Sequence, residues 1–133
     1  MGNLLLRKLG RSLPVALAAV ALSAAPAMAD AQGNFNIVKS GHSKASGRIV
    51  VNERFSDDKV WFKGSITKLS SRGCDWLEAD GHKISEVCGK KGTKKWMNKA
   101  IIYGIFGGTS LEYRLCHEFG DGQTCSKSKT FDW

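Results

Sequence analysis

Residues 116–125, Cys-His-Glu-Phe-Gly-Asp-Gly-Gln-Thr-Cys, place two cysteines on either side of a hairpin signal. A two-residue loop at Gly120-Asp121 has glycine at its first central position, as a type II′ turn requires. With this loop, Cys116 directly faces Cys125 at a position where the two backbones approach most closely. A loop that begins one residue later would place Cys116 opposite Lys127 instead. The sequence therefore predicts an antiparallel β-ribbon that is closed by a Cys116–Cys125 disulfide.

The other two cysteines flank a second hairpin signal, Asp80-Gly81. This turn brings Cys74 within one residue of facing Cys88, and a β-bulge or a three-residue loop would absorb the offset. A metal site is the alternative use of four cysteines, but their spacing contains no Cys-x-x-Cys pair. We therefore predict a second disulfide, Cys74–Cys88, and no metal site.

Short segments with a period of two fill the rest of the chain. In residues 60–67, Val-Trp-Phe-Lys-Gly-Ser-Ile-Thr, apolar side chains alternate with a second set, as in a β-strand. The spacing of the turn signals predicts an all-β fold, namely a small immunoglobulin-like antiparallel sandwich of about six to eight strands with two disulfides. A helix competes with a strand over residues 94–103, which contain good helix formers.

The first 29 residues have the organisation of a secretory signal peptide. A positive region with Arg7, Lys8 and Arg11 precedes an apolar run, and Ala27-Met28-Ala29 supplies a small-x-small cleavage pattern. The apolar run is interrupted by prolines and is shorter than the roughly 20 residues of a spanning helix. We therefore expect a secreted, extracellular protein with no membrane span.

Residues 30–46 are rich in Gly, Ser, Asn and Lys around one apolar cluster, Phe35, Ile37 and Val38. This composition is typical either of a flexible N-terminal arm or of a first edge strand. We predict an arm over residues 30–46 that precedes a sandwich domain at residues 47–133. In this hypothesis the three apolar side chains dock into a groove on a protein partner, and the arm adds as a strand to the partner's sheet.

Several short motifs then occur in a distinctive order: Val60 to Thr67, Gly73-Cys74, Cys88-Gly-Lys-Lys-Gly-Thr93, Arg114-Leu-Cys116 and Thr124-Cys125. In these motifs the chain resembles the small exported two-disulfide β-sandwich proteins of actinobacteria. The resemblance covers residues 47 to 131 and implies the fold and the compartment. Some exported proteins of this kind are adaptor subunits of secreted antibacterial toxin particles, which implies docking through an N-terminal arm.

The sequence contains no recognisable catalytic centre. There is no nucleophile elbow, no His-Glu-x-x-His helix and no phosphate-binding glycine loop. His42, His82 and His117 are too far apart in sequence to predict a zinc site, and the pair His117-Glu118 diverges because neighbouring strand residues point to opposite faces. We expect exposed polar residues near turns here, and neither an enzyme nor a cofactor.

The densest positive charge lies in a basic segment of residues 90–96. It can contact an anionic polymer of the cell surface, with Trp96 stacking on a sugar, or it can be a solvated loop. Lysines without arginine are poor readers of bases, so we expect no nucleic-acid partner. Trp61 lies on the sheet face opposite to Val60 and Phe62, either as an exposed contact residue or covered by the arm or by Trp133. The basic segment consists of Lys90, Lys91, Lys94, Lys95 and Trp96.

These patterns favour a secreted, non-catalytic binding or adaptor protein that engages a protein partner. The resemblance to exported actinobacterial proteins implies that this partner is part of a secreted antibacterial toxin complex. One alternative is a binder of glycans or anionic surface polymers through the basic segment. Another is a small secreted inhibitor or toxin that presents a rigid loop at Ser70–Gly73.

Overall fold

The computed structural model describes residues 31–104 and 107–133, so the predicted signal peptide lies outside the described residues. Within this part of the chain every regular element is a strand, and there are nine of them. They are β2 (Gln32–Lys39), β3 (Ser43–Glu53), β4 (Asp57–Lys68), β5 (Cys74–Ala79), β6 (His82–Cys88), β7 (Lys94–Gly104), β8 (Ser110–Phe119), β9 (Gly122–Cys125) and β10 (Lys129–Asp132).

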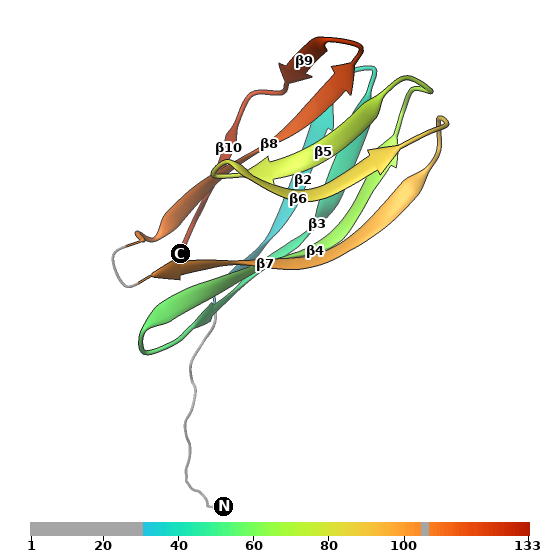
Figure 1. Cartoon of the computed structure of the whole chain (residues 1–133). Helices are drawn as coiled ribbons and strands as arrows, with labels where there is room; N and C mark the ends of the chain where they lie inside the picture. The colour runs from blue at the N-terminus through green and yellow to red at the C-terminus, as the bar shows by residue number, and fades with distance from the viewer. Residues whose placement is uncertain (1–30, 105–106) are drawn as a thin grey trace, which may run out of the picture. The chain divides into compact units, whose positions relative to one another are not determined.

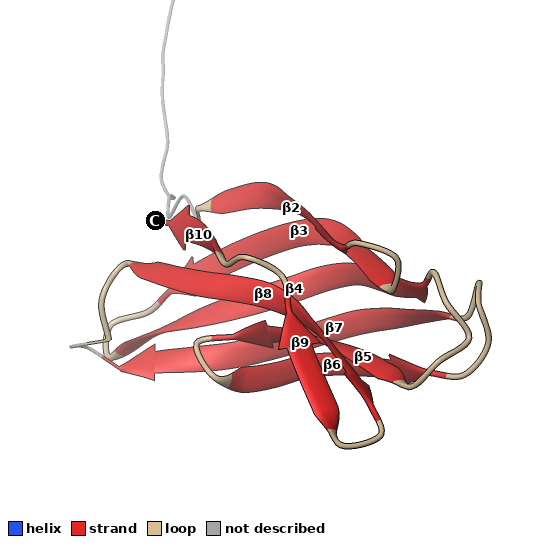
Figure 2. Ribbon diagram, turned by 90° about the horizontal axis from the view of Figure 1, so that it is seen from above, coloured by secondary structure: helices blue, strands red, loops and turns tan. Residues whose placement is uncertain are grey.

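The strands form two antiparallel sheets that enclose one core (Figures 1 and 2). One sheet has the order β2-β3-β4-β7, and the other has the order β10-β8-β5-β6, with β9 also paired to β8. The chain changes sheet between β4 and β5, between β6 and β7, and between β7 and β8, which is typical of Greek-key sandwiches. The predicted all-β antiparallel sandwich with two disulfides is confirmed.

The predicted ribbon at residues 116–125 has the expected register. Cys116 faces Cys125, and Phe119 faces Gly122 across the two-residue loop. The sulfur atoms of Cys116 and Cys125 are bonded, as are those of Cys74 and Cys88.

The offset at the second hairpin is absorbed by a β-bulge. Cys74 faces Cys88, whereas Glu78 faces Lys83, and the register shifts between Leu77 and Glu78. The Cys74–Cys88 pair is the predicted one, and the β-bulge is one of the two predicted ways to absorb the offset. Both disulfides lie on the outer face of this sheet, where Trp76 is the cross-strand neighbour of Cys116.

The chain after this hairpin is not one continuous strand. Cys125 faces Cys116, but Lys129 faces Tyr113, so this strand contains one more residue than β8 between the two pairs. At the break, the backbone N–H of Leu115 donates to the hydroxyl of Ser126 at 3.0 Å. A β-bulge therefore divides the chain after the hairpin into two strands, β9 and β10.

The prediction of a flexible arm over residues 30–46 is wrong for residues 31–46, which the structure describes. Gln32–Lys39 pairs along its whole length with β3, so the chain before residue 47 belongs to the sandwich. Phe35 and Ile37 are each only 2% exposed, and the Phe35 ring makes edge contacts with Phe62 at 5.6 Å and with Tyr113 at 6.0 Å. Burial of these apolar side chains, which alternate along β2, holds the strand in the sheet.

The competing helix over residues 94–103 does not form. Lys94–Gly104 pairs with β4 from Thr67 to Asp57, and its buried side chains, Met97 and Ile101, lie on the core side of the strand. Cross-strand pairing and burial override the local helix propensity of these residues.

Replacing Phe35 with alanine will test the assignment of β2 to the core. We expect Phe35→Ala to lower the free energy of unfolding by about 3–5 kcal/mol, because the truncation leaves a cavity between the two sheets. The measurement is chemical denaturation monitored by tryptophan fluorescence. Val38→Ala is the matched control, since Val38 is 52% exposed and its truncation should change stability by less than about 0.5 kcal/mol. Equal stability of the two variants would contradict this placement.

Candidate functional site

The structure separates the three apolar residues that were predicted to dock into a partner. Phe35 and Ile37 are buried in the core and cannot serve as anchors, whereas Val38 is exposed on the outer face of β2. The sequence pattern contained this alternation, but it did not show which side of the strand would be covered. The surface that β2 offers to a partner is therefore its edge and its outer face.

The free edge of β2 presents peptide groups that are not paired with another strand. β2 pairs only with β3 in the described structure, and it ends its sheet. The carbonyls of Ala31 and Lys39 accept hydrogen bonds from Val51 and His42 on the β3 side. Because peptide groups alternate in direction along an antiparallel strand, those of Asn34, Asn36 and Val38 face away from β3.

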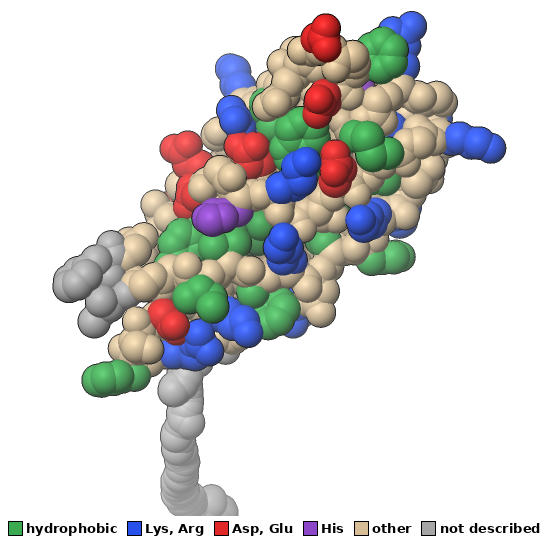
Figure 3. Space-filling view, viewed as in Figure 1, with side chains coloured by type: hydrophobic (Ala, Val, Ile, Leu, Met, Phe, Trp, Pro, Cys, Tyr) green, Lys and Arg blue, Asp and Glu red, His purple; other side chains and the backbone are tan. Residues whose placement is uncertain are grey.

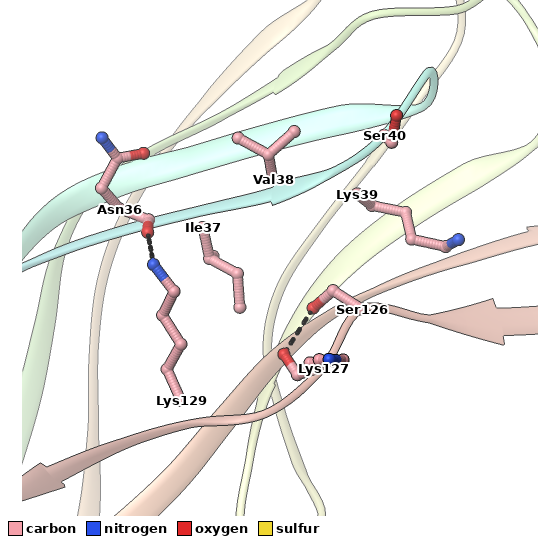
Figure 4. A pocket seen from close by; sticks show the side chains of 8 residues that line it. All are labelled: Asn36, Ile37, Val38, Lys39, Ser40, Ser126, Lys127 and Lys129. Carbon is pink, nitrogen blue, oxygen red and sulfur yellow. Dashed lines mark hydrogen bonds between the residues drawn. The ribbon is translucent and has the colours of Figure 1, made fainter.

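A groove of about 670 Å³ runs beside this edge (Figure 4). One wall is β2, and the other is the segment around the bulge between β9 and β10. Its lining contains three lysines and no acidic residue. The lining residues are Asn36, Ile37, Val38, Lys39, Ser40, Ser126, Lys127 and Lys129.

One side chain crosses from β10 to the edge. Lys129 Nζ donates to the backbone oxygen of Asn36 at 2.7 Å, as the dashed line in Figure 4 marks. This bond is exposed and is made by a flexible side chain, so an incoming donor can replace it at small cost. The groove thus combines the free edge of β2, the ammonium group of Lys129 on a flexible side chain, and the apolar side chain of Ile37 in its lining.

The predicted basic segment does not form one surface. Lys90 and Lys91 lie in the turn between β6 and β7, whereas Lys94 and Trp96 belong to the outer face of β7. The side chain of Lys95 points to the other side of β7 from those of Lys94 and Trp96, and Lys95 pairs with Ile66 of β4. Trp96 is 72% exposed.

Trp61 lies on the outer face of β4 and is half-buried. The ammonium groups of Lys59 and Lys63 lie 4.7 Å and 5.4 Å from the centroid of its ring. Trp133, which was considered as a cover, donates instead to Asp58 and packs against Tyr103. The contacts to the Trp61 ring therefore come from lysines of its own strand.

A cluster of buried polar side chains lies between the sheets, near the ends of β4 and β5. Lys68 Nζ lies 2.8 Å from Asp75 Oδ1, and neither side chain is exposed. Ser43 donates its hydroxyl to Asp75 Oδ2 at 2.7 Å. His117 Nδ1 lies 3.0 Å from Asp75 Oδ1, and the His117 ring stacks on His42 at 3.8 Å. His117 is 6% exposed, so the expectation of an exposed residue beside a turn is wrong.

The geometry of this cluster does not activate a nucleophile. The Ser43 hydroxyl donates to the carboxylate rather than to a histidine, so the cluster lacks the serine–histidine contact of a hydrolase triad. The remaining protons of Lys68 are directed to the carbonyls of Arg72 and Gly73. The cluster therefore satisfies every charge that it buries and ties β3, β4, β5 and β8 to the loop before β5.

Gly73 is required by this packing. It has a positive φ of 60°, and a Cβ at this position would lie 1.9 Å from the carbonyl oxygen of Glu118. Only glycine permits both the backbone conformation and the close approach of β8. The loop at Ser70–Gly73, the candidate inhibitory loop, is thus fixed by hydrogen bonds from the Lys68 ammonium group to the carbonyls of Arg72 and Gly73.

Two groups of the cluster have shifted pKa values. Burial alone would raise the pKa of the Asp75 carboxyl, but hydrogen bonds from Lys68, Ser43 and His117 outweigh burial and lower it. Partial burial, together with the neighbouring His117 and Lys39, lowers the pKa of His42.

Cys74, Glu86 and Cys88 bring three potential metal-ligand atoms within 4.8 Å of one another. Both sulfur atoms belong to the Cys74–Cys88 disulfide, so neither is a thiolate that could bind a soft metal. This group carries no metal proposal.

No family model, no curated protein and no solved structure matches this chain. Among residues 31–104 and 107–133, there is no helix that is both long and apolar enough to cross a membrane. The two disulfides point to an oxidising environment.

Two pH ranges of weakening stability follow from the pKa shifts. The lowered pKa of His42 favours its neutral form in the folded state, so stability is lost as pH falls below the ordinary value of 6.5. The lowered pKa of Asp75 gives stability that is present above 3.8 and is lost as pH falls through its folded-state value. Thermal unfolding between pH 8 and pH 2 will measure both losses. His42→Gln should abolish the first loss and keep the second, and a first loss that persists in this variant would refute the assignment.

Removing one partner of the buried ion pair should be costly. We expect Asp75→Asn to lower the free energy of unfolding by about 3–5 kcal/mol, because Lys68 is left buried without a counter-charge. The double replacement Lys68→Met/Asp75→Leu removes both charges and should recover part of that loss, because the Ser43 hydroxyl and the His117 ring still lose their partner. Denaturant titration at pH 7 compares the variants, and the double variant also provides a folded reference if Asp75→Asn does not fold. A double variant less stable than Asp75→Asn would show that the charges are needed as a pair.

Proposed function

We propose that the protein is a secreted, non-catalytic binding protein that captures an extended segment of a protein partner along the edge of β2. The partner segment adds to the sheet as a further strand, with its backbone paired to Asn34, Asn36 and Val38. Its side chains alternate between the groove and the outer face, which gives the contact a fixed register.

The observation that carries this proposal is the undefended edge of β2. Edge strands are usually short, or are blocked by proline, by charges or by bulges, because unpaired peptide groups recruit other strands. β2 has eight residues, no proline and one charged residue, Lys39, at its end. Where the covering strand would lie, the structure has a groove and the single exposed bond of Lys129 to Asn36.

The charges beside the edge indicate the chemistry of the segment. Lys39, Lys127 and Lys129 line the groove without an acidic residue. An acidic extended segment places carboxylates near these ammonium groups, whereas a basic segment is repelled. A second copy of this chain would bring the same lysines together across the edge and is disfavoured for the same reason.

An adaptor role agrees with this placement, because strand addition uses one edge and leaves both outer faces of the sandwich free. A secreted toxin complex is the setting suggested by the resemblance of the chain to exported actinobacterial proteins. The proposal for the site does not depend on that setting.

Replacing Val38 with proline tests strand addition directly. The N–H of Val38 faces the free edge, so proline removes a group needed by an added strand while every β2–β3 bond is kept. The probe is a fluorescein-labelled heptapeptide of alternating Glu and Val, and its affinity is measured by fluorescence anisotropy. We expect Val38→Pro to weaken binding at least about tenfold, a loss of about 1.4 kcal/mol.

Val38→Thr is the matched control, because it changes the side chain but keeps the N–H and should retain binding. If Val38→Pro does not fold, N-methylation of alternate peptide bonds in the probe removes the same hydrogen bonds from the ligand side. A probe of alternating Lys and Val should not bind. Equal binding to both probes, or binding that is unaffected by Val38→Pro and by N-methylation, would refute the proposal.

A further inference from the structure

The outer face of the β2-β3-β4-β7 sheet collects positive charge and tryptophan. We call it the basic-tryptophan face and define it by five cations and two indoles on β3, β4 and β7, whose strand neighbours point into the core. These residues are Lys44, Arg48, Lys59, Lys63, Lys94, Trp61 and Trp96.

Register brings these side chains together from distant parts of the sequence. Lys63 lies between Arg48 and Asn98 in one row across the strands, and Trp61 lies between Val50 and Ala100 in the next. The rest of the face consists mainly of amides and hydroxyls. Among the residues of β2, β3, β4 and β7 that point to this outer face, Asp57 is the one acidic residue. It is the first residue of β4, and its carboxylate is paired with Arg54.

Two like charges converge on one ring at the centre of this face. Lys59 and Lys63 lie on either side of Trp61 in sequence, and both ammonium groups lie within 5.4 Å of its ring centroid. The indole attracts each cation, but the two cations repel each other. An anionic group bound beside Trp61 would contact both ammonium groups and relieve that repulsion.

The opposite face of the sandwich has a different character. In the view of Figure 3, which looks onto the sheet that contains β5, β6 and β8, acidic side chains are mixed with basic ones. There Glu78 pairs with Arg114 and Glu86 pairs with Lys83. Ion pairs thus occur on that face, whereas the basic-tryptophan face carries five cations and one acidic residue, Asp57.

We infer that the basic-tryptophan face binds an anionic polysaccharide. The cations meet the acidic groups of the polymer, the amides and hydroxyls bond to sugar hydroxyls, and Trp96, which is 72% exposed, packs on the face of a sugar ring. Trp61 and Trp96 are four residues apart along neighbouring strands, a separation of about 14 Å from strand geometry, so one chain of several sugars can reach both.

A polysaccharide fits this face better than other polyanions. A polyol phosphate has no ring to stack on Trp96, and a nucleic acid would be read by arginines, of which the face has one, Arg48. The site is separate from the edge of β2 and does not rest on peptide capture there.

The test is isothermal titration with a hexamer of galacturonic acid at 50 mM and 300 mM NaCl. We expect Lys59→Gln/Lys63→Gln to weaken binding at least about tenfold at the lower salt concentration. Trp96→Ala should weaken it at least about threefold, with Trp96→Phe closer to wild type. Binding to the wild type should also weaken as salt rises, because the exposed charges are screened.

Lys90→Gln/Lys91→Gln is the matched control, because it removes the same charge from the turn outside this face and should leave affinity within about twofold. Lys127→Gln, which changes the groove wall between β9 and β10, should also leave sugar binding unchanged, which separates this site from the groove beside β2. Three results would overturn the inference: equal binding of the fully methyl-esterified hexamer, full binding by Lys59→Gln/Lys63→Gln, or tighter binding of a thymidine oligonucleotide or of poly(glycerol phosphate).

Discussion

Burial of the Phe35 and Ile37 side chains is the constraint on which the surfaces of this protein depend. Once these two residues face the core, the period of two along a strand fixes the other features of β2. Val38 faces outward, and the alternate peptide groups point away from β3. A strand that supplies part of the core thus also supplies an unpaired edge. Core packing and the proposed peptide-binding edge therefore share the same eight residues.

The bulge between β9 and β10 completes that edge. If β9 and β10 were one continuous strand, its hydrogen bonds to β8 would run without interruption along the side of the sandwich next to β2. The one-residue shift turns Ser126 toward Leu115, and the segment at the bulge becomes a wall of the groove. An irregularity of one residue therefore shapes one wall of the groove beside β2.

The buried cluster around Asp75 links strands of both sheets. Its charges are compensated within the protein, and its bonds join β3, β4, β5 and β8 at one end of the sandwich. Buried ion pairs add little net stability compared with apolar packing, but an alternative arrangement that leaves Lys68 unpaired is strongly disfavoured. The cluster thereby selects one packing of the two sheets, and the outer faces inherit that geometry.

Local rules were sufficient for the covalent framework. Turn chemistry at Gly120-Asp121 and at Asp80-Gly81, with the alternation of strand residues, determined both disulfides, their registers and the bulge beside Leu77, because hairpin pairs are close in sequence.

Other features were decided only by tertiary structure. Whether β2 was free or buried depended on contacts with Phe62 and Tyr113, and the partner of His117 was Asp75, 42 residues away. The basic-tryptophan face likewise joins residues of β3, β4 and β7 through the register between strands. Trp96 could therefore be predicted from the sequence, whereas the row that contains Arg48 and Lys63 could not. The physical reason is that pairing within a hairpin is fixed by its turn, whereas pairing between distant strands is fixed by which faces the core buries.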